Sequence, residues 1–390
     1  MTLSTAGKYV GIIALSLSVL SVLYIGAFVY QLGALVPAEY WIYETQIVKR
    51  ELLAEHRDKR KILFVAGSST FFGIDAGRIE QALGTDTLNL GVSIARPFAV
   101  MVNDIMPYVQ TGDVVIFPLE YELYHAETTY TDWFTNQVMA WDPDYFWELH
   151  ATEKVRFMRS VLPQRVLLGA ITKAVGSHLE SVQARQLKPP DHIRSLIRAA
   201  WSQPNYRPSK MYSLLNNDRH GNAIMRTPEP VVVSTGDPYE LDIDFIDSPY
   251  FWSTLQGFVE HCRAKGVSVY IAWPLVVSEK LNFRSSRVTQ GVSEIMGRLR
   301  EMGISVLGNP SDFQYDIGHF TDKLYHLTLQ GRAEHIARLL AHLMNEPRLF
   351  LTKKHTSATK TSFYGTARPA SCVAPMRLCH RTLSPIVNRL

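Results

Sequence analysis

Cysteine is scarce in this chain: only Cys262, Cys372 and Cys379 occur among its 390 residues. Three cysteines so far apart can build neither a disulfide scaffold nor a cysteine-based metal site. The chain also lacks the repeated apolar segments of a multi-span membrane protein, and its mean hydropathy is -0.03. Its apolar fraction of 46% is too high for a disordered chain. The sequence therefore predicts a folded protein of one large domain or two small ones.

Basic charge is concentrated at one end of the chain. Lys and Arg number 40 against 36 Asp and Glu, but residues 353–390 hold seven of the basic residues and no acidic residue. Without this stretch, 33 basic and 36 acidic residues remain. The stretch is rich in Ser, Thr, Pro and Ala without apolar periodicity, which predicts a disordered tail. Such a tail could bind a polyanion, although a solvated terminus is the simpler interpretation. The positive balance is therefore no evidence for a nucleic-acid partner.

One long uncharged run stands out, the 30 residues from Tyr9 to Ala38. About 20 apolar residues are enough to cross a bilayer, so this run can span one. The apolar region of a cleavable signal peptide has about 7–15 residues, which is shorter than this run. We therefore predict an uncleaved membrane anchor over residues 1–38. The basic residues that follow are interspersed with acids, so the positive-inside rule does not decide on which side the body lies.

The body of the chain alternates short apolar runs with amphipathic stretches. Residues 39–60 are predicted to form a charged helix that lifts the domain off the membrane. Strands are expected over 61–66, 85–90, 113–118, 267–274 and 304–307, and helices over 75–83, 97–110, 251–265, 288–302 and 330–344. This alternation predicts an α/β fold, a three-layer α/β/α sandwich around a five-stranded, mostly parallel sheet. One domain over 39–352 is expected, with a large helical and irregular insertion at about 121–245, after strand three, folding over the strand ends.

Two clusters of polar residues lie where chemistry is expected in such a sheet, beyond the carboxyl ends of the strands. Ser68 and Ser69 directly follow the first strand. A serine at a strand-to-helix turn can act as a nucleophile if a base is near, although it can also simply cap the turn. His326 lies just before the last predicted helix, with Asp322 four residues earlier. An imidazole with an orienting carboxylate is the base that a serine nucleophile needs.

These blocks resemble the SGNH (GDSL-type) superfamily of hydrolases and acyltransferases over residues of about 61–120 and 267–345. The resemblance makes Ser69 the nucleophile, His326 its base and Asp322 the acid that orients the imidazole. It also implies that the backbone amides of Ser69 and Gly91 form the oxyanion hole. The Tyr-His-Leu-Thr sequence at 325–328, followed by Gly at 331, looks like membrane-anchored members of this group.

The chain departs from the family pattern at two points. Asp322 precedes His326 by four residues where three are usual. Glu120 stands where the family supplies an asparagine side chain as an oxyanion donor, and a carboxylate cannot donate unless it is protonated. Loss of one such donor costs about 100-fold or more in rate. The departures indicate a slow enzyme, an enzyme that borrows a donor from the insertion, or a specialised transferase. They are similar to those of proteins of D-alanine transfer to teichoic acid and of alginate O-acetylation.

The resemblance therefore implies a serine-dependent O-acyltransferase or esterase that acts on acyl groups, expected to be acetyl, of a cell-surface polysaccharide. It also implies one amino-terminal anchor, a body facing the periplasm or the outside, and no cofactor or metal. Glu120, Trp133 and Trp141 are candidates for substrate contact, although the simpler interpretation is that the tryptophans form the insertion's own core.

Two alternatives remain open. One is an esterase for lipid or small acyl esters. The other is a catalytically weak accessory protein that binds glycan or a multi-span membrane acyltransferase in an export complex. Glu120 favours the accessory protein, whereas the set of Ser69, Asp322 and His326 favours an enzyme.

Overall fold

The computed structural model describes residues 5–34, 38–176, 188–224, 248–322 and 324–346. These residues belong to one compact unit, 1–350. The predicted tail at 353–390 lies outside the described residues, as does the carboxyl-terminal part of the predicted insertion, from 225 to 245.

A five-stranded parallel sheet forms the centre of the fold, with the strand order β2-β1-β3-β4-β6. This confirms the α/β class and the parallel sheet. The strands are Lys61–Phe64 (β1), Asp86–Asn89 (β2), Val114–Pro118 (β3), Ser268–Ala272 (β4) and Ser305–Leu307 (β6). Every residue of β1 and β3 is buried, as expected of central strands in a parallel sheet. A second, very short parallel pair joins β5 (Val276–Val277) to β7 (Gln314–Tyr315). Two-residue strands leave no pattern that sequence could reveal.

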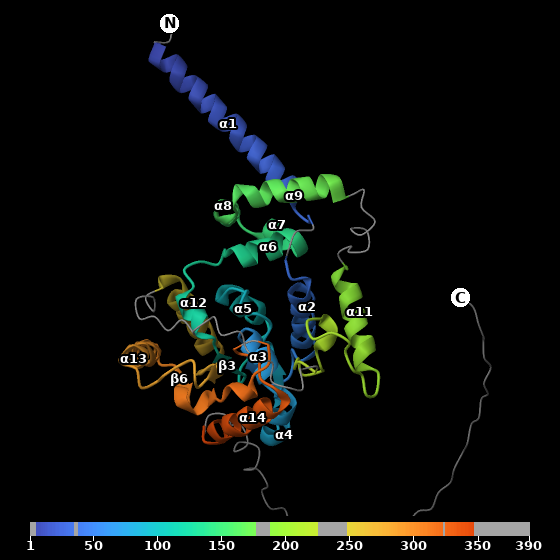
Figure 1. The fold of residues 1–390 in the computed structure, drawn as a ribbon, viewed down its shortest axis with the longest axis vertical. Helices are drawn as coiled ribbons and strands as arrows, with labels where there is room; N and C mark the ends of the chain where they lie inside the picture. Colours follow the sequence, from blue (N-terminus) through green and yellow to red (C-terminus); the bar gives the residue numbers. More distant parts are fainter. Residues whose placement is uncertain (1–4, 35–37, 177–187, 225–247, 323, 347–390) are drawn as a thin grey trace, which may run out of the picture. The chain divides into compact units, whose positions relative to one another are not determined.

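The helices follow the strands in the expected alternation (Figure 1). Asp75 and Thr328 cap two of the predicted helices, because their side chains accept the N–H groups of Arg78 and Gly331. The helices are Thr5–Gln31 (α1), Tyr40–Glu55 (α2), Ser68–Gly73 (α3), Ala76–Leu83 (α4), Phe98–Ile105 (α5), Asp132–Trp141 (α6), Pro143–Glu148 (α7), Ala151–Ser160 (α8), Pro163–Gly176 (α9), Pro190–Trp201 (α11), Pro249–Lys265 (α12), Ser286–Glu301 (α13) and Leu329–Met344 (α14).

Helix α2 corrects one expectation, because it is not a spacer between membrane and domain. Val48 and Leu52 are fully buried in the main hydrophobic core. The charges that suggested an exposed helix are paired instead: Glu51 lies in ion pairs with Arg194 and Arg198 of α11. Lys188 and the arginines of α11 thus pair with acidic residues of α2 across one interface.

Helix α1 is long and apolar enough to span a membrane. Its segment from Gly7 to Gln31 has 25 residues and contains an 18-residue window with a mean hydropathy of 2.4. Most of its side chains are exposed, but Phe28 near its end is fully buried against α7 and α8. The end of α1 is therefore part of the packed unit (Figure 1).

The residues between β3 and β4, 119–267, are called the β3–β4 segment here. It holds α6 to α9, α11 and α12. Part of it extends the sheet region at the β2 edge, where the Asn89 N–H donates to the carbonyl of His220 at 2.8 Å. Lys49 of α2 links β2 to the β3–β4 segment, since its ammonium donates to the carbonyls of Asn89 and Gly221. The segment is thus bound into the body through buried polar contacts.

Candidate active site

The strand order places the candidate site at a topological switch point. From β1 the chain moves outward to β2 and then crosses back to β3, so the loops after β1 and β3 leave neighbouring strands in opposite directions. In open α/β sheets, ligands bind in the crevice that opens at this point. Ser69 follows β1 as the second residue of α3, and Glu120 follows β3. The two predicted site residues therefore come together from different strands.

Glu120 fills the turn in front of Ser69. Its two carboxylate oxygens accept the N–H groups of Gly67 at 3.0 Å and of Ser69 at 2.9 Å. Glu120 is fully buried. Burial raises the pKa of its carboxyl group, while the backbone hydrogen bonds from the turn offset part of this shift. The side chain predicted as a substrate contact thus binds backbone in this structure, and one of the expected oxyanion amides, that of Ser69, is already occupied.

The second expected oxyanion amide is occupied as well. The Gly91 N–H donates to the Asn89 side chain at 2.9 Å, and the Asn89 amide in turn donates to the carbonyl of Thr70 at 2.8 Å. A Cβ atom at Gly91 would lie 2.4 Å from the backbone nitrogen of Phe71. Only glycine fits this close approach of the loop after β2 to α3. Gly91 is therefore required for packing here, whatever its role in chemistry.

His326 and Asp322 form the predicted pair. The Nδ1 atom of His326 lies 3.0 Å from Asp322 Oδ1, and the imidazole is 4% exposed. Burial alone would raise the pKa of Asp322, but the hydrogen bonds from His326, Tyr212 and Thr321 outweigh it and hold the pKa well below its usual range. An ionised carboxylate beside Nδ1 favours the tautomer that carries its proton on Nδ1, so that Nε2 is the nitrogen that can accept a proton.

Tyr212 is a member of this cluster that sequence reasoning missed. Its hydroxyl donates to Asp322 Oδ2 and lies 3.4 Å from His326 Nδ1. Its ring packs near Phe72 and Trp41. Tyr212 belongs to the β3–β4 segment, more than 100 positions before the pair that it contacts, and no local motif marks it. Only the folded chain reveals the contact.

Ser69 and the pair are neighbours through Phe72. The His326 ring packs on the Phe72 ring with centroids 4.2 Å apart. Phe72 follows Ser69 by three positions on α3, so the two side chains share one face of that helix. The Ser69 hydroxyl is buried and makes no hydrogen bond of good geometry within the described residues, although it lies close enough to the Glu120 carboxyl to offset part of the rise in the pKa of that group. The structure therefore places His326, with its partner Asp322, against the face of α3 that carries Ser69. Ser69 does not donate a hydrogen bond to His326.

The site is closed in this structure, since Ser69 is 2% exposed and Glu120 is fully buried. A ligand can contact the Ser69 hydroxyl only if neighbouring side chains move.

The two predicted aromatic contacts lie in α6. Trp141 is buried and its indole N–H donates to the carbonyl of Ala38 at 2.9 Å, and its ring packs 4.7 Å from that of Tyr40. This environment is that of a packing residue. Trp133 is instead exposed.

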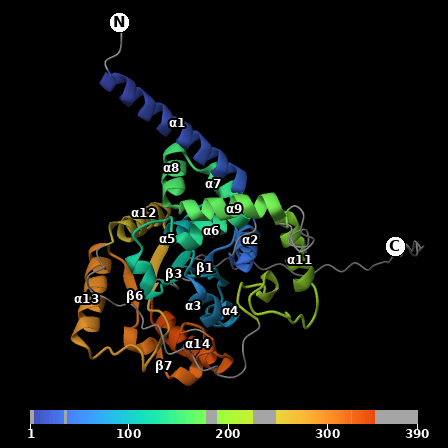
Figure 2. The same cartoon turned by 45° about the horizontal axis from the view of Figure 1, so that its top comes forward.

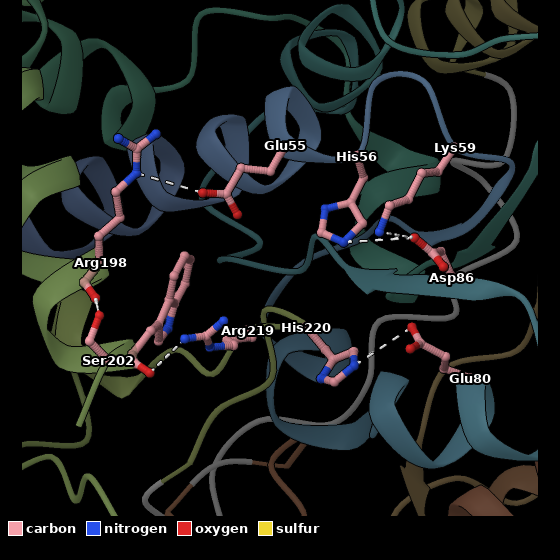
Figure 3. A pocket seen from close by; sticks show the side chains of 10 residues that line it. Glu55, His56, Lys59, Glu80, Asp86, Arg198, Ser202, Arg219 and His220 are labelled. Carbon is pink, nitrogen blue, oxygen red and sulfur yellow. Dashed lines mark hydrogen bonds and ion pairs between the residues drawn. The ribbon is translucent and has the colours of Figure 1, made fainter. Parts of the chain in front are cut away.

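A separate cavity of about 360 Å³ lies at the β2 edge of the molecule (Figure 3). Most of its charged side chains pair with one another: Lys59 Nζ lies 2.9 Å from Asp86 Oδ2, and His220 Nε2 lies 3.6 Å from Glu80 Oε2. Asp86 begins β2, whereas the candidate site lies at the opposite, carboxyl end of the strands. The cavity is thus separate from the Ser69 site, and a lining of both charge signs favours no particular ligand.

The part of the chain that the structure describes contains no group of three or more His, Cys, Asp or Glu side chains arranged to hold a metal ion. No family model matches the sequence, and no curated protein matches it either.

Proposed function

We propose that this protein is a serine enzyme of the SGNH type that transfers or hydrolyses O-acyl groups on a cell-surface polysaccharide. The acyl group that we expect is acetyl. The observation that carries the proposal is the His326–Asp322 pair, 3.0 Å apart, packed on the same short helix that presents Ser69 at the switch point of the sheet. A three-layer α/β/α sandwich with the β3–β4 segment as an insertion over the strand ends belongs to the same proposal.

The chemistry follows from the roles of three side chains. His326 Nε2 removes the proton of Ser69 as its Oγ atom bonds to the ester carbonyl carbon. The carbonyl oxygen becomes an oxyanion, the ester C–O bond then breaks, and the imidazolium gives its proton to the departing hydroxyl group. Water or a sugar hydroxyl next attacks the acyl-serine, passing its proton to His326 and restoring Ser69. Asp322 stabilises the imidazolium in both halves of the reaction.

The oxyanion requires donors that are engaged in this structure. The Ser69 amide is bound by Glu120 and the Gly91 amide by Asn89. Substrate binding must therefore displace at least one of these acceptors. The acyl donor and the polysaccharide are the partners that the proposal requires, and a multi-span membrane acyltransferase is a further candidate partner.

Fluorophosphonate labelling tests the proposal directly, because the probe phosphonylates an activated serine. Wild-type protein is expected to be labelled, Ser69→Ala to be unlabelled, and His326→Ala to react about 100-fold or more slowly for want of its base. Ser68→Ala is the matched control and should label like wild type. An unlabelled wild type, or equal labelling of Ser69→Ala, rejects the serine enzyme.

The second candidate is an accessory protein with little or no catalysis, which binds glycan or a membrane acyltransferase. The occupied amides and the closed Ser69 support it. An absence of labelling together with measurable binding of an acylated polysaccharide would favour this candidate over the enzyme.

The proposal also assigns α1 as a retained anchor with the body in the periplasm or outside the cell. The burial of Phe28 supports retention, because cleavage after the span would remove a core side chain. Protease treatment of intact spheroplasts should degrade the body if it faces outward, and a protected body would contradict this assignment.

A further inference from the structure

Helix α9 carries an apolar face that points away from the protein. Leu167, Leu168, Ile171 and Val175 recur at the spacing of one helix face, and each is between 49% and 62% exposed. The opposite face holds buried Val166 and Gly169. This is the reverse of a helix on a water-exposed surface, where the outward face is polar. Such a face calls for an apolar partner.

The position of α9 indicates what that partner is. The apolar span of α1 ends at Gln31, and Gln31 accepts a hydrogen bond from Arg165 of α9 at 2.9 Å. Lys173, two turns further along α9, donates to the carbonyl of Leu32 at 2.7 Å. Figures 1 and 2 both show α9 beside this end of α1. The helix is thus fixed at the level where the span of α1 leaves the hydrocarbon.

Contacts between α1 and the neighbouring helices also occur further inside the apolar span, before Gln31. The Tyr24 hydroxyl donates to the carbonyl of Met158 in α8 at 3.1 Å. Tyr24 precedes Gln31 by seven residues, which is about 10 Å along a helix. The Gly169 backbone also approaches α1 closely, since a Cβ there would lie 3.1 Å from Gln31 Cβ. Once α1 is inserted, the end of α8 therefore lies up to about 10 Å inside the point where the span ends, a depth comparable with the roughly 5–10 Å to which interfacial helices bury their apolar faces.

The neighbouring residues are of the kinds found at membrane interfaces. Trp147 of α7 is 51% exposed, with the Lys154 ammonium 5.9 Å from its ring centre. Arg156 and Arg159 of α8, the helix that precedes α9, are exposed as well. Exposed tryptophan and basic side chains next to an apolar helix face are typical of segments that lie in an interface.

We propose that α9 lies in the membrane interface, with its face of Leu167, Leu168, Ile171 and Val175 inserted into the lipid, so that the protein sits on the bilayer as well as hanging from α1. The occupant of the face is lipid because α9 is hydrogen-bonded to the end of α1, whose own exposed apolar side chains need lipid in any case. The proposal depends on insertion of α1 and is independent of any chemistry at Ser69.

The test uses the full chain with one copy in each nanodisc of phosphatidylcholine and phosphatidylglycerol at about three to one, to supply the anionic surface that basic side chains favour. The three native cysteines are replaced (Cys262→Ala, Cys372→Ser, Cys379→Ser), and an environment-sensitive NBD fluorophore is attached at Ile171→Cys or, as a second position, Leu167→Cys. Ser293→Cys on α13 is the matched control, exposed on a helix that packs at the far edge strand, β6.

The α9 probes are expected to emit at shorter wavelength than the control. Lipid spin-labelled near the top of the acyl chain should quench them at least about threefold more strongly, and aqueous iodide correspondingly less, as for groups buried about 5–10 Å into the interface. Equal iodide quenching at both α9 positions and the control would overturn the proposal and leave a protein partner for this face. Shielding from iodide without quenching by the spin-labelled lipid would overturn it as well, since protein rather than lipid would then cover the helix.

Discussion

At Glu120, the two oxygens of one buried carboxylate accept the N–H groups of Gly67 and Ser69. Hydrogen bonds to a charged acceptor are about twice as strong as neutral ones. The carboxylate therefore holds the turn in place and, at the same time, occupies the amide that would stabilise an oxyanion on Ser69. At the scale of one residue, the same hydrogen bonds that stabilise the turn also keep the Ser69 amide from binding an oxyanion.

Replacing Glu120 by Ala should separate these two effects. The change frees the Ser69 amide, so fluorophosphonate labelling of Ser69 should become faster by at least about tenfold, within the roughly 100-fold that one oxyanion donor provides. The same change should lower the free energy of unfolding by about 1–3 kcal/mol, because buried N–H groups lose their acceptor. The two measurements are the labelling rate and urea denaturation.

Glu122→Gln is the control for this pair of measurements. Glu122 lies two positions on and accepts the Tyr325 hydroxyl at 2.8 Å, and glutamine keeps an acceptor there. This variant should leave the labelling rate of Ser69 near the wild-type value. Slower labelling in Glu120→Ala, with the fold intact, would instead make Glu120 a residue that positions Ser69 for reaction.

Gly91 is a residue whose substitution should harm the fold before it can affect chemistry. A Cβ at this position would meet Phe71 N at 2.4 Å and Gly67 O at 2.8 Å, and backbone atoms cannot move aside. Gly91→Ala should therefore destabilise the protein by about 1–3 kcal/mol in urea denaturation. Gly257→Ala on α12, where nothing lies within 4 Å, is the control and should be neutral or stabilising. Equal stability of the two variants would contradict the observed close approach.

At the scale of elements, helix α14 contributes a pH dependence of stability through one buried imidazole. His335 is 2% exposed and its Nδ1 atom lies 3.1 Å from the Tyr315 hydroxyl. Burial, together with the charge of Arg338, lowers the pKa of His335 from 6.5 to about 3. Between these two pH values the unfolded chain binds a proton that the folded chain does not bind. Stability is therefore fully present above pH 6.5 and is lost as the pH falls, by up to about 1.4 kcal/mol per pH unit.

His335→Gln should flatten this part of the stability curve. The prediction is checked by urea denaturation at several pH values between 4 and 7. In this window of about 3 pH units, the folded and unfolded chains differ by the one proton that binds to His335. His192→Gln removes an exposed imidazole of α11 and should leave the slope as in wild type. The same steep slope in His335→Gln would mean that other groups cause the acid sensitivity.

Most elements were predictable because their signals are local. Asp75 and Thr328 cap the helices that the sequence predicts over 75–83 and 330–344, and the apolar runs before Gly67 and after Asp113 are strands. Helix α2 was misread for a physical reason. Its charges are satisfied by α11, which lies about 150 positions later, and a charged helix whose partners are distant looks like an exposed one.

At the scale of the whole molecule, the candidate site depends on contacts between distant segments. The pair of Asp322 and His326 was predictable because its members are four positions apart. The bonds from Glu120 to the turn before Ser69 join positions 51 and 53 apart, and Tyr212 reaches Asp322 across 110 positions. Sequence patterns give candidate residues within one segment, whereas which groups occupy the oxyanion amides is decided by how three segments pack.

The joint between α1 and the body makes the anchor part of the folded unit. Phe28 of α1 is fully buried between Phe146 and Phe157, with ring centres 5.2 and 6.2 Å away. Phe28→Ala should leave a cavity there and lower the free energy of unfolding by about 3–5 kcal/mol. Tyr9→Ala, at a position of the same helix that is 65% exposed, should have little effect. Thermal unfolding of the full chain in detergent compares the two, and equal unfolding temperatures would mean that α1 is only a tether, not a structural part of the domain.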